Sequence, residues 1–274
     1  MKKFLPAAAL ALLIPSSLLV CLGQSAHPSA SAPPAALSDK EIIRRTRAAY
    51  YSLSELGLSK FQVTAAPEWK KYIAEVMPTQ HGSTQPDAQK IAQMEEVQYS
   101  VSVSGEGTVT VKPFRSGGGE IDPALDQTVD GMRQMLQGFY TTWLPMVFTN
   151  PFPDPEAPYS IKREQEKYRV LTQNGDSAAE IVLDKNYLAT EMTVDTPQFK
   201  VKIAPVYQKT AKGLLLTSID SEINGGQMKV YVSIDYKAVQ GFELPDHVLY
   251  KVPMADKPGS MITVESWFVH YQLN

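Results

Sequence analysis

The spacing of hydrophobic residues predicts two long helices in this chain. Over residues 38–57 and 123–146, apolar side chains recur every three or four positions, which is the period of an amphipathic helix. Weaker patterns of the same period predict short helices over 67–77 and 87–96, and Pro78 is expected to end the first of these. The helices therefore lie in the first 146 residues.

Strict alternation of apolar and polar residues predicts that most of the remaining chain is β-sheet. It begins with a hairpin over 97–111 and, after a proline-rich connection over 149–159, continues to the C-terminus. The longest unbroken run covers 228–238. Gly241 then allows a reversal, and Pro245 is expected at a strand start, a bulge or an edge because it has no N–H to donate. We expect about nine to eleven antiparallel strands, with one domain over residues 38–274.

The N-terminal 23 residues have the layout of a secretory signal peptide. Lys2 and Lys3 precede an apolar run over residues 4–20, and small residues follow it. A Pro/Ala/Ser-rich tether over 24–37 then leads to the domain. We expect a periplasmic or secreted protein whose mature chain begins near residue 24.

Cys21, the only cysteine, has two interpretations. It either lies by chance near an ordinary cleavage site or carries a lipid that would tether the protein to a membrane. In both cases the domain has no cysteine, so its stability cannot depend on an intramolecular disulfide.

The net charge of the chain bears on which classes of partner it can bind. The net charge is −3, and removal of the signal peptide with its two lysines leaves 24 basic and 29 acidic residues, a net charge of −5. This balance argues against binding to nucleic acid and against simple adhesion to anionic lipid.

Sequence motifs of catalysis are absent. The chain contains no G-x-S-x-G, H-E-x-x-H or C-x-x-C motif, and the three histidines beyond the tether, His81, His247 and His270, have no partner group within a motif. The glycine-rich stretch at 115–120 lacks the context of a phosphate-binding loop. We therefore expect no enzymatic activity, no metal site and no cofactor.

A resemblance to a known family is carried by the C-terminal strands. "GLLLTSIDSEI" at 213–223, "YKAVQGFELP" at 236–245 and the final "YQLN" resemble the C-terminal half of LolA/LolB-type outer-membrane lipoprotein-sorting proteins. The resemblance implies an α+β fold: a strongly curved antiparallel sheet, an incomplete β-barrel, with helices packed in its concave face. In the sorting proteins, that concavity receives acyl chains.

The resemblance makes the binding or carriage of an apolar ligand, such as a lipid or a lipoprotein acyl chain, the leading functional hypothesis. A carrier must keep unfilled apolar volume, whereas an envelope protein-interaction or sensing module needs none. For a carrier, the apolar stripe on the 123–146 helix would form one wall of the ligand site and the 228–238 strand the other. Ordinary core packing is the alternative interpretation of that stripe. The candidate ligand-binding residues are Met132, Met135, Leu136, Phe139, Trp143, Val230, Val232 and Ile234.

Overall fold

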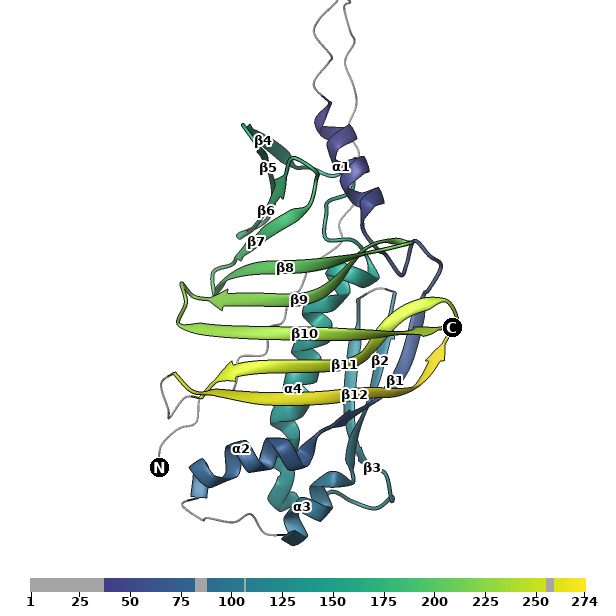
Figure 1. Ribbon diagram of the computed structural model, residues 1–274, viewed down its shortest axis with the longest axis vertical. Coiled ribbons are helices and arrows are strands. Elements are labelled where there is room, and N and C mark those ends of the chain that lie inside the picture. The colour runs from purple at the N-terminus through teal and green to yellow at the C-terminus, as the bar shows by residue number, and fades with distance from the viewer. Residues whose placement is uncertain (1–36, 82–87, 106, 255–258) are drawn as a thin grey trace, which may run out of the picture.

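The computed structural model describes residues 37–81, 88–105, 107–254 and 259–274. The predicted signal peptide, Cys21 and nearly all of the tether lie outside these residues, so their predictions are not addressed by the structure. Within the described part, four α-helices accompany one large β-sheet (Figure 1).

The first helix is shorter than its sequence pattern predicts. α1 spans Asp39–Ala49, and the side chain of Ser38 accepts a hydrogen bond from the Glu41 amide (3.2 Å), as expected for an N-cap. The helix ends at Ala49 rather than near residue 57 because Tyr50 is extended and forms a parallel β-bridge with Leu214. A long-range contact therefore overrides the local periodicity.

The two short helices lie at the lower end of the sheet (Figure 1). α2 spans Trp69–His81 and α3 spans Ala88–Glu95. The expectation that Pro78 ends α2 was wrong, since the helix continues for one further turn. The Trp69 indole is buried and donates to the Val97 carbonyl oxygen (2.7 Å), which fixes the start of α2 against the sheet.

The twelve strands found among the described residues belong to one antiparallel sheet, whose order is β3-β2-β1-β12-β11-β10-β9-β8-β7-β6-β5-β4. This confirms an antiparallel α+β fold; the sheet is not closed into a barrel. The strand bounds are β1 Lys60–Pro67, β2 Val97–Ser104, β3 Val109–Arg115, β4 Ser160–Glu164, β5 Lys167–Asn174, β6 Ser177–Asp184, β7 Ala189–Asp195, β8 Lys200–Thr210, β9 Gly213–Ile223, β10 Met228–Val239, β11 Phe242–Pro253 and β12 Met261–Leu273.

The strand count exceeds the expected nine to eleven because of β4. This strand is mostly exposed and has no alternating apolar face, so its sequence carries no period-two signal. It forms through backbone pairing with β5 at the end of the sheet.

The central helix is built from three pieces. A 3₁₀ turn at Pro123–Leu125 leads into α4, Asp126–Trp143, which passes into a π-helical turn at Leu144–Phe148. Pro145 has no N–H for the helical ladder, and the turn is closed by a bond from the Thr149 amide to the Leu144 carbonyl, five residues back (3.1 Å). The predicted helix over 123–146 therefore exists, but α4 itself stops at Trp143.

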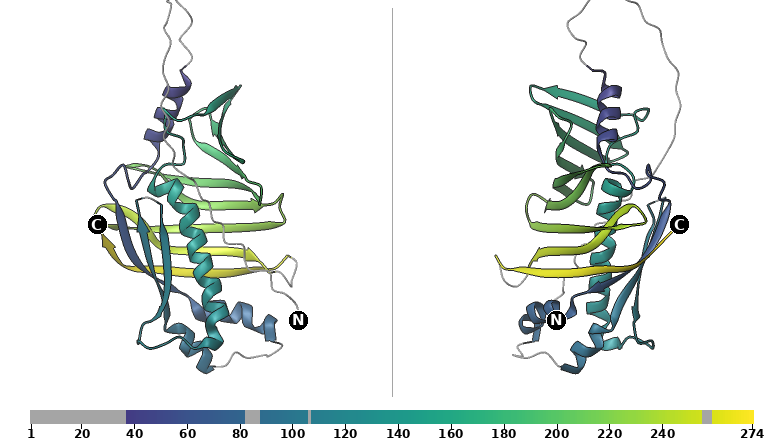
Figure 2. Two further views of the ribbon diagram at one scale, coloured as in Figure 1. Left: turned by 180° about the vertical axis from the view of Figure 1, so that it is seen from behind. Right: turned by 45° about the vertical axis from the view of Figure 1, so that its right-hand side comes forward.

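The sheet curves around α4, which lies on its concave side (Figure 2). The Phe139 ring lies 6.0 Å from the rings of both Tyr250 and Phe268, and the Trp143 ring lies 6.4 Å from Phe61. The buried apolar side chains form one hydrophobic cluster, whose members range along the sequence from Ile42 to Phe268. The described residues thus share a single core, and α4 fills the middle of it.

Candidate functional site

The sheet splits between β9 and β10. Their pairing runs from Ile223–Met228 to Ser218–Ser233 and then stops. The outer pairings continue, β8 with β9 as far as Thr210–Gly213 and β10 with β11 as far as Val239–Phe242. Residues 213–217 and 234–239 therefore face each other across a gap in the sheet, which we call the opening.

Two β-bulges lie where the strands separate. Val206 pairs with Ser218 but Tyr207 pairs with Leu216, so Thr217 is an extra residue in β9. On the other side, Asp235 pairs with His247 but Tyr236 pairs with Pro245, which makes Asp246 an extra residue in β11. A bulge bends its strand and increases the local twist, so two bulges at the same level turn the hairpins away from each other. Pro245 thus lies at a bulge, one of the three predicted positions.

The opening is a cavity of about 600 Å³ with a mostly polar lining. Leu215 and Ile234 are its buried apolar residues. Two carboxylates, from Asp235 and Glu243, are the only charged groups in the lining, which includes neither lysine nor arginine. Gln208, Thr210, Thr217, Ser218, Tyr231, Ser233 and Tyr236 complete it.

The segment that follows α1 closes one end of the opening; we call residues 50–54 the strap. Tyr51 donates its amide to the Leu214 carbonyl (3.0 Å), and its hydroxyl accepts from the Glu243 amide (2.7 Å). Lys212 also joins the two hairpin ends by donating to the Gly241 carbonyl. The strap thus bridges β9 and β11, where a strand would otherwise continue the sheet.

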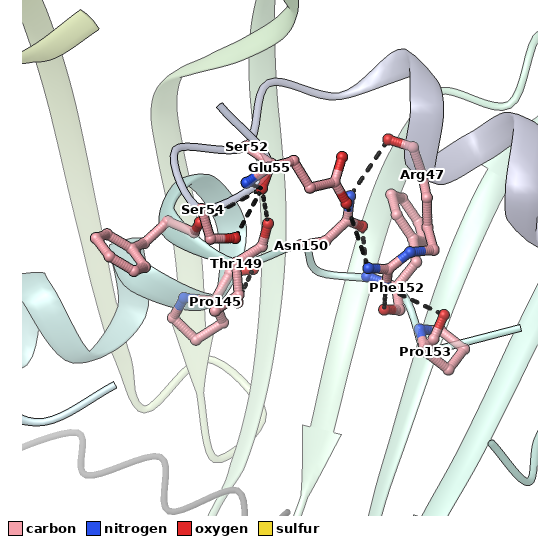
Figure 3. Close-up of polar contacts among 10 residues, drawn as sticks. Arg47, Ser52, Ser54, Glu55, Pro145, Thr149, Asn150, Phe152 and Pro153 are labelled. Carbon is pink, nitrogen blue, oxygen red and sulfur yellow. Dashed lines mark hydrogen bonds and ion pairs between the residues drawn. The ribbon is translucent and has the colours of Figure 1, made fainter. Parts of the chain in front are cut away.

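Hydrogen bonds to the π-helical turn hold the strap in place (Figure 3). The Ser52 hydroxyl donates to the Thr149 carbonyl and lies 3.2 Å from the Ser54 hydroxyl. The backbone amides of Leu53 and Ser54 donate to the Val147 and Phe148 carbonyls (2.9 and 2.8 Å). The strap is therefore fixed to the end of the central helix as well as to the sheet.

Arg47, in the last turn of α1, anchors the same region (Figure 3). Its guanidinium donates to the carbonyl oxygens of Phe152 and Pro153 (2.8 and 3.3 Å) and lies 3.4 Å from the Glu55 carboxylate. The Asn150 side-chain amide donates back to the Arg47 carbonyl (3.3 Å). The proline-rich connection over 149–159 is thus tied to α1.

Tyr236 connects the opening with the central helix. Its hydroxyl accepts a hydrogen bond from the Trp143 indole nitrogen (2.9 Å), while the residue also lines the opening. Burial raises the pKa of the Tyr236 hydroxyl, and likewise that of Tyr51. Both groups therefore remain protonated at neutral pH and act as neutral hydrogen-bonding groups.

A charged network extends from the opening across the outer face of the sheet. The His247 imidazole lies 3.2 Å from the Asp235 carboxylate through Nδ1 and 3.1 Å from the Glu265 carboxylate through Nε2. Lys71 of α2 forms an ion pair with Glu265, and its hydrogen bond, with a smaller contribution from His247, lowers the pKa of that carboxyl. The network fixes Asp235 at the border of the opening.

The residues predicted to bind a ligand lie in the filled core. Met132, Leu136, Phe139 and Trp143 are at most 4% exposed, and Val232 and Ile234 are also buried. Met135 and Val230 are partly buried and pack against the same cluster. The structure brings these residues into one core, and only Ile234 also lines the opening. Their role in ligand binding stays a prediction.

Tyr250 carries a buried hydroxyl group close to these core residues. It is 3% exposed, and its oxygen has no hydrogen-bond partner among the described residues. An unsatisfied buried polar group costs about 1–3 kcal/mol, so Tyr250→Phe is expected to raise the free energy of unfolding by about 1 kcal/mol in urea denaturation. Tyr271→Phe is the control, because its hydroxyl donates to the Pro245 carbonyl (2.6 Å) and its loss should destabilise the protein. Destabilisation by Tyr250→Phe would show that the hydroxyl does have a partner in solution.

The sequence patterns missed the opening and its charged border. Asp235, His247 and Glu265 lie on three different strands, so no local motif unites them. The one local signal is the run Leu214-Leu215-Leu216, which breaks the alternation next to the bulge at Thr217. It indicates an irregular strand but gives no information about its partner.

Comparisons with known proteins found no relatives from which a function could be transferred. No protein-family model, no curated protein and no solved structure matches the chain. Within the part of the chain that the structure describes, none of the helices combines the length and the apolar character needed to cross a membrane. A function for this chain can therefore be inferred only from its own sequence and site.

Proposed function

We propose that this chain is an exported, non-enzymatic binding protein that holds a small polar ligand in the opening between β9 and β10. The observation that carries the proposal is the cavity itself, about 600 Å³ in volume, at a split in an otherwise continuous sheet. Ligand pockets commonly have volumes of about 300–1,000 Å³. The predicted signal peptide supports an envelope or secreted location.

The chemistry of the lining defines the kind of ligand. Hydroxyl and amide groups can both donate and accept hydrogen bonds, whereas the carboxylates of Asp235 and Glu243 accept only. Without a basic group in the lining, an anionic ligand would meet uncompensated negative charge. A neutral or cationic ligand with several N–H or O–H donors fits this lining best.

The second candidate is the apolar carrier implied by the LolA/LolB resemblance. The open sheet that curves around α4, with a stripe of methionine and aromatic side chains on that helix, favours it. However, the core side chains of α4 and the sheet already occupy the space between them. A lipid could enter only if α4 moved away from the sheet, so this proposal requires a conformational change that the polar site does not.

A cavity-filling variant tests the proposed function. Ser233 lines the opening on β10, and Ser233→Trp should block the cavity. Lys229→Trp is the matched control, because Lys229 lies on the same face of the same strand, is exposed and is not part of the lining. Wild type and both variants would be isolated from the envelope fraction and compared by native mass spectrometry, followed by extraction of any bound molecule.

We expect wild type and Lys229→Trp to carry the same additional mass and Ser233→Trp to have lost it. A bound lipid that persists in Ser233→Trp would favour the apolar carrier. Wild type that carries no molecule after isolation, and that binds none when ligands are added, would contradict both binding functions and favour the interaction module.

A further inference from the structure

We propose that the ligand is a saccharide chain that begins in the opening and continues across the outer face of the sheet to Trp267. This inference rests on the proposed function and adds the ligand class and a second contact surface. A row of side chains leads out of the opening.

The row is set by strand register. Asp235 on β10 pairs with His247 on β11, and His247 pairs with Trp267 on β12. Directly paired residues point to the same face of a sheet, so all three side chains lie on the face that carries the opening. Neighbouring strands are about 4.8 Å apart, and the row therefore extends roughly 10 Å beyond the cavity, the length of a short oligosaccharide segment.

Trp267 differs from the other two tryptophans of the chain. Trp69 and Trp143 are buried, whereas Trp267 is 44% exposed. Its ring packs against the His247 imidazole, with 4.3 Å between the ring centroids and 31° between the ring planes. The indole is thus held in place on the sheet surface, although burying it would remove more apolar area from water.

An aromatic ring of this kind suits a sugar. The C–H groups of a pyranose ring form an apolar face that packs on an aromatic ring, while its hydroxyls point sideways to polar partners. At the other end of the row, at the border of the opening, the Asp235 side chain is 74% exposed and is oriented by His247. An ionised carboxylate accepts strong hydrogen bonds from neighbouring hydroxyls, and Glu243 can do the same inside the opening.

Other ligand classes fit this surface less well. A phosphate or carboxylate ligand would face Asp235 and Glu243 without a basic partner in the lining. A peptide could add to the free edge of β9, as the strap does at Leu214, but that mode uses backbone groups and needs no contact with Trp267. The exposed Trp267 ring, which we call the platform, lies in one row with the hydroxyl-rich cavity. This arrangement favours a saccharide.

Intrinsic fluorescence and calorimetry can test this inference together. Chitotetraose, cellotetraose and maltotetraose would each be titrated into the purified mature protein. Because Trp69 and Trp143 are buried, Trp267 is the tryptophan that a ligand can contact directly, and the Trp267→Ala variant identifies its share of any fluorescence change. We expect saturable binding of at least one tetrasaccharide, with a fluorescence change that disappears in Trp267→Ala.

Matched variants separate the platform from the cavity. Trp267→Ala and Asp235→Asn should each weaken binding at least tenfold, and Ser233→Trp should abolish it. Met261→Ala should bind as wild type, since Met261 lies on the same strand and face as Trp267 and is also 44% exposed. Near-ultraviolet circular dichroism would establish that each variant is folded.

The possible outcomes distinguish this inference from the proposed function. If Ser233→Trp releases a bound molecule but hydrolysis of that molecule yields no sugar, and no tetrasaccharide binds, the saccharide is excluded and the cavity function stands. If Trp267→Ala binds as tightly as wild type, the platform is excluded. If native mass spectrometry finds no bound molecule and no tetrasaccharide binds, both proposals fail.

Discussion

Phe139→Ala is expected to lower the free energy of unfolding by about 3–5 kcal/mol, the usual cost of truncating a buried aromatic residue. Phe139 is 4% exposed and lies at the centre of the interface between α4 and the sheet. Its ring is within 5.0–6.2 Å of the rings of Tyr140, Trp143, Tyr250 and Phe268. Urea denaturation followed by circular dichroism would measure the loss.

Met135→Ala provides the control on the same helix. Met135 is only partly buried, so its truncation should cost clearly less than that of Phe139. The comparison also bears on the apolar carrier. A wall kept open for an acyl chain would tolerate truncation, so a loss below about 1 kcal/mol for Phe139→Ala would contradict the packed core and favour the carrier.

Gly213→Ala is expected to lower the free energy of unfolding by about 2–4 kcal/mol, because it combines backbone strain with overpacking. Gly213 has φ +123°, a value that side chains disfavour. An added Cβ would also lie 2.8 Å from both the Tyr50 carbonyl carbon and the Tyr51 amide nitrogen, which are backbone atoms of the strap. The strap would have to move away from β9.

Gly225→Ala isolates the effect of this close approach. Gly225 also has a positive φ, +71°, but an added Cβ would meet no atom within 4 Å. Its cost should be about 1–2 kcal/mol, from the backbone alone. Gly213→Ala should in addition speed amide exchange at Leu53 and Ser54, which bond to the π-helical turn. Equal costs and unchanged exchange would show that the strap does not depend on Gly213.

Periodicity predicted the elements that are specified locally. The alternation at 228–238 became β10, and Gly241 took the positive φ (+86°) that its turn requires. The same reasoning failed where a distant partner decides the structure. Tyr50 leaves the α1 pattern because β9 offers it a bridge.

The candidate site could not be predicted from local sequence patterns, because it too depends on distant partners. The opening depends on two bulges, at Thr217 and Asp246, that meet only after four strands have paired. The stripe on α4 was predicted correctly as an apolar face, but its spacing cannot distinguish a packed core from a ligand wall. That distinction depends on how many side chains from the sheet occupy the same space.

Differential hydrogen exchange would locate the ligand most directly. Protein isolated with its bound molecule would be compared with protein that has been unfolded, dialysed and refolded. We expect removal of the ligand to speed exchange at 214–218 and 231–236, on both sides of the opening, and to leave exchange in α4 unchanged. Faster exchange confined to α4, with no change at the opening, would place the ligand between helix and sheet and would contradict the account.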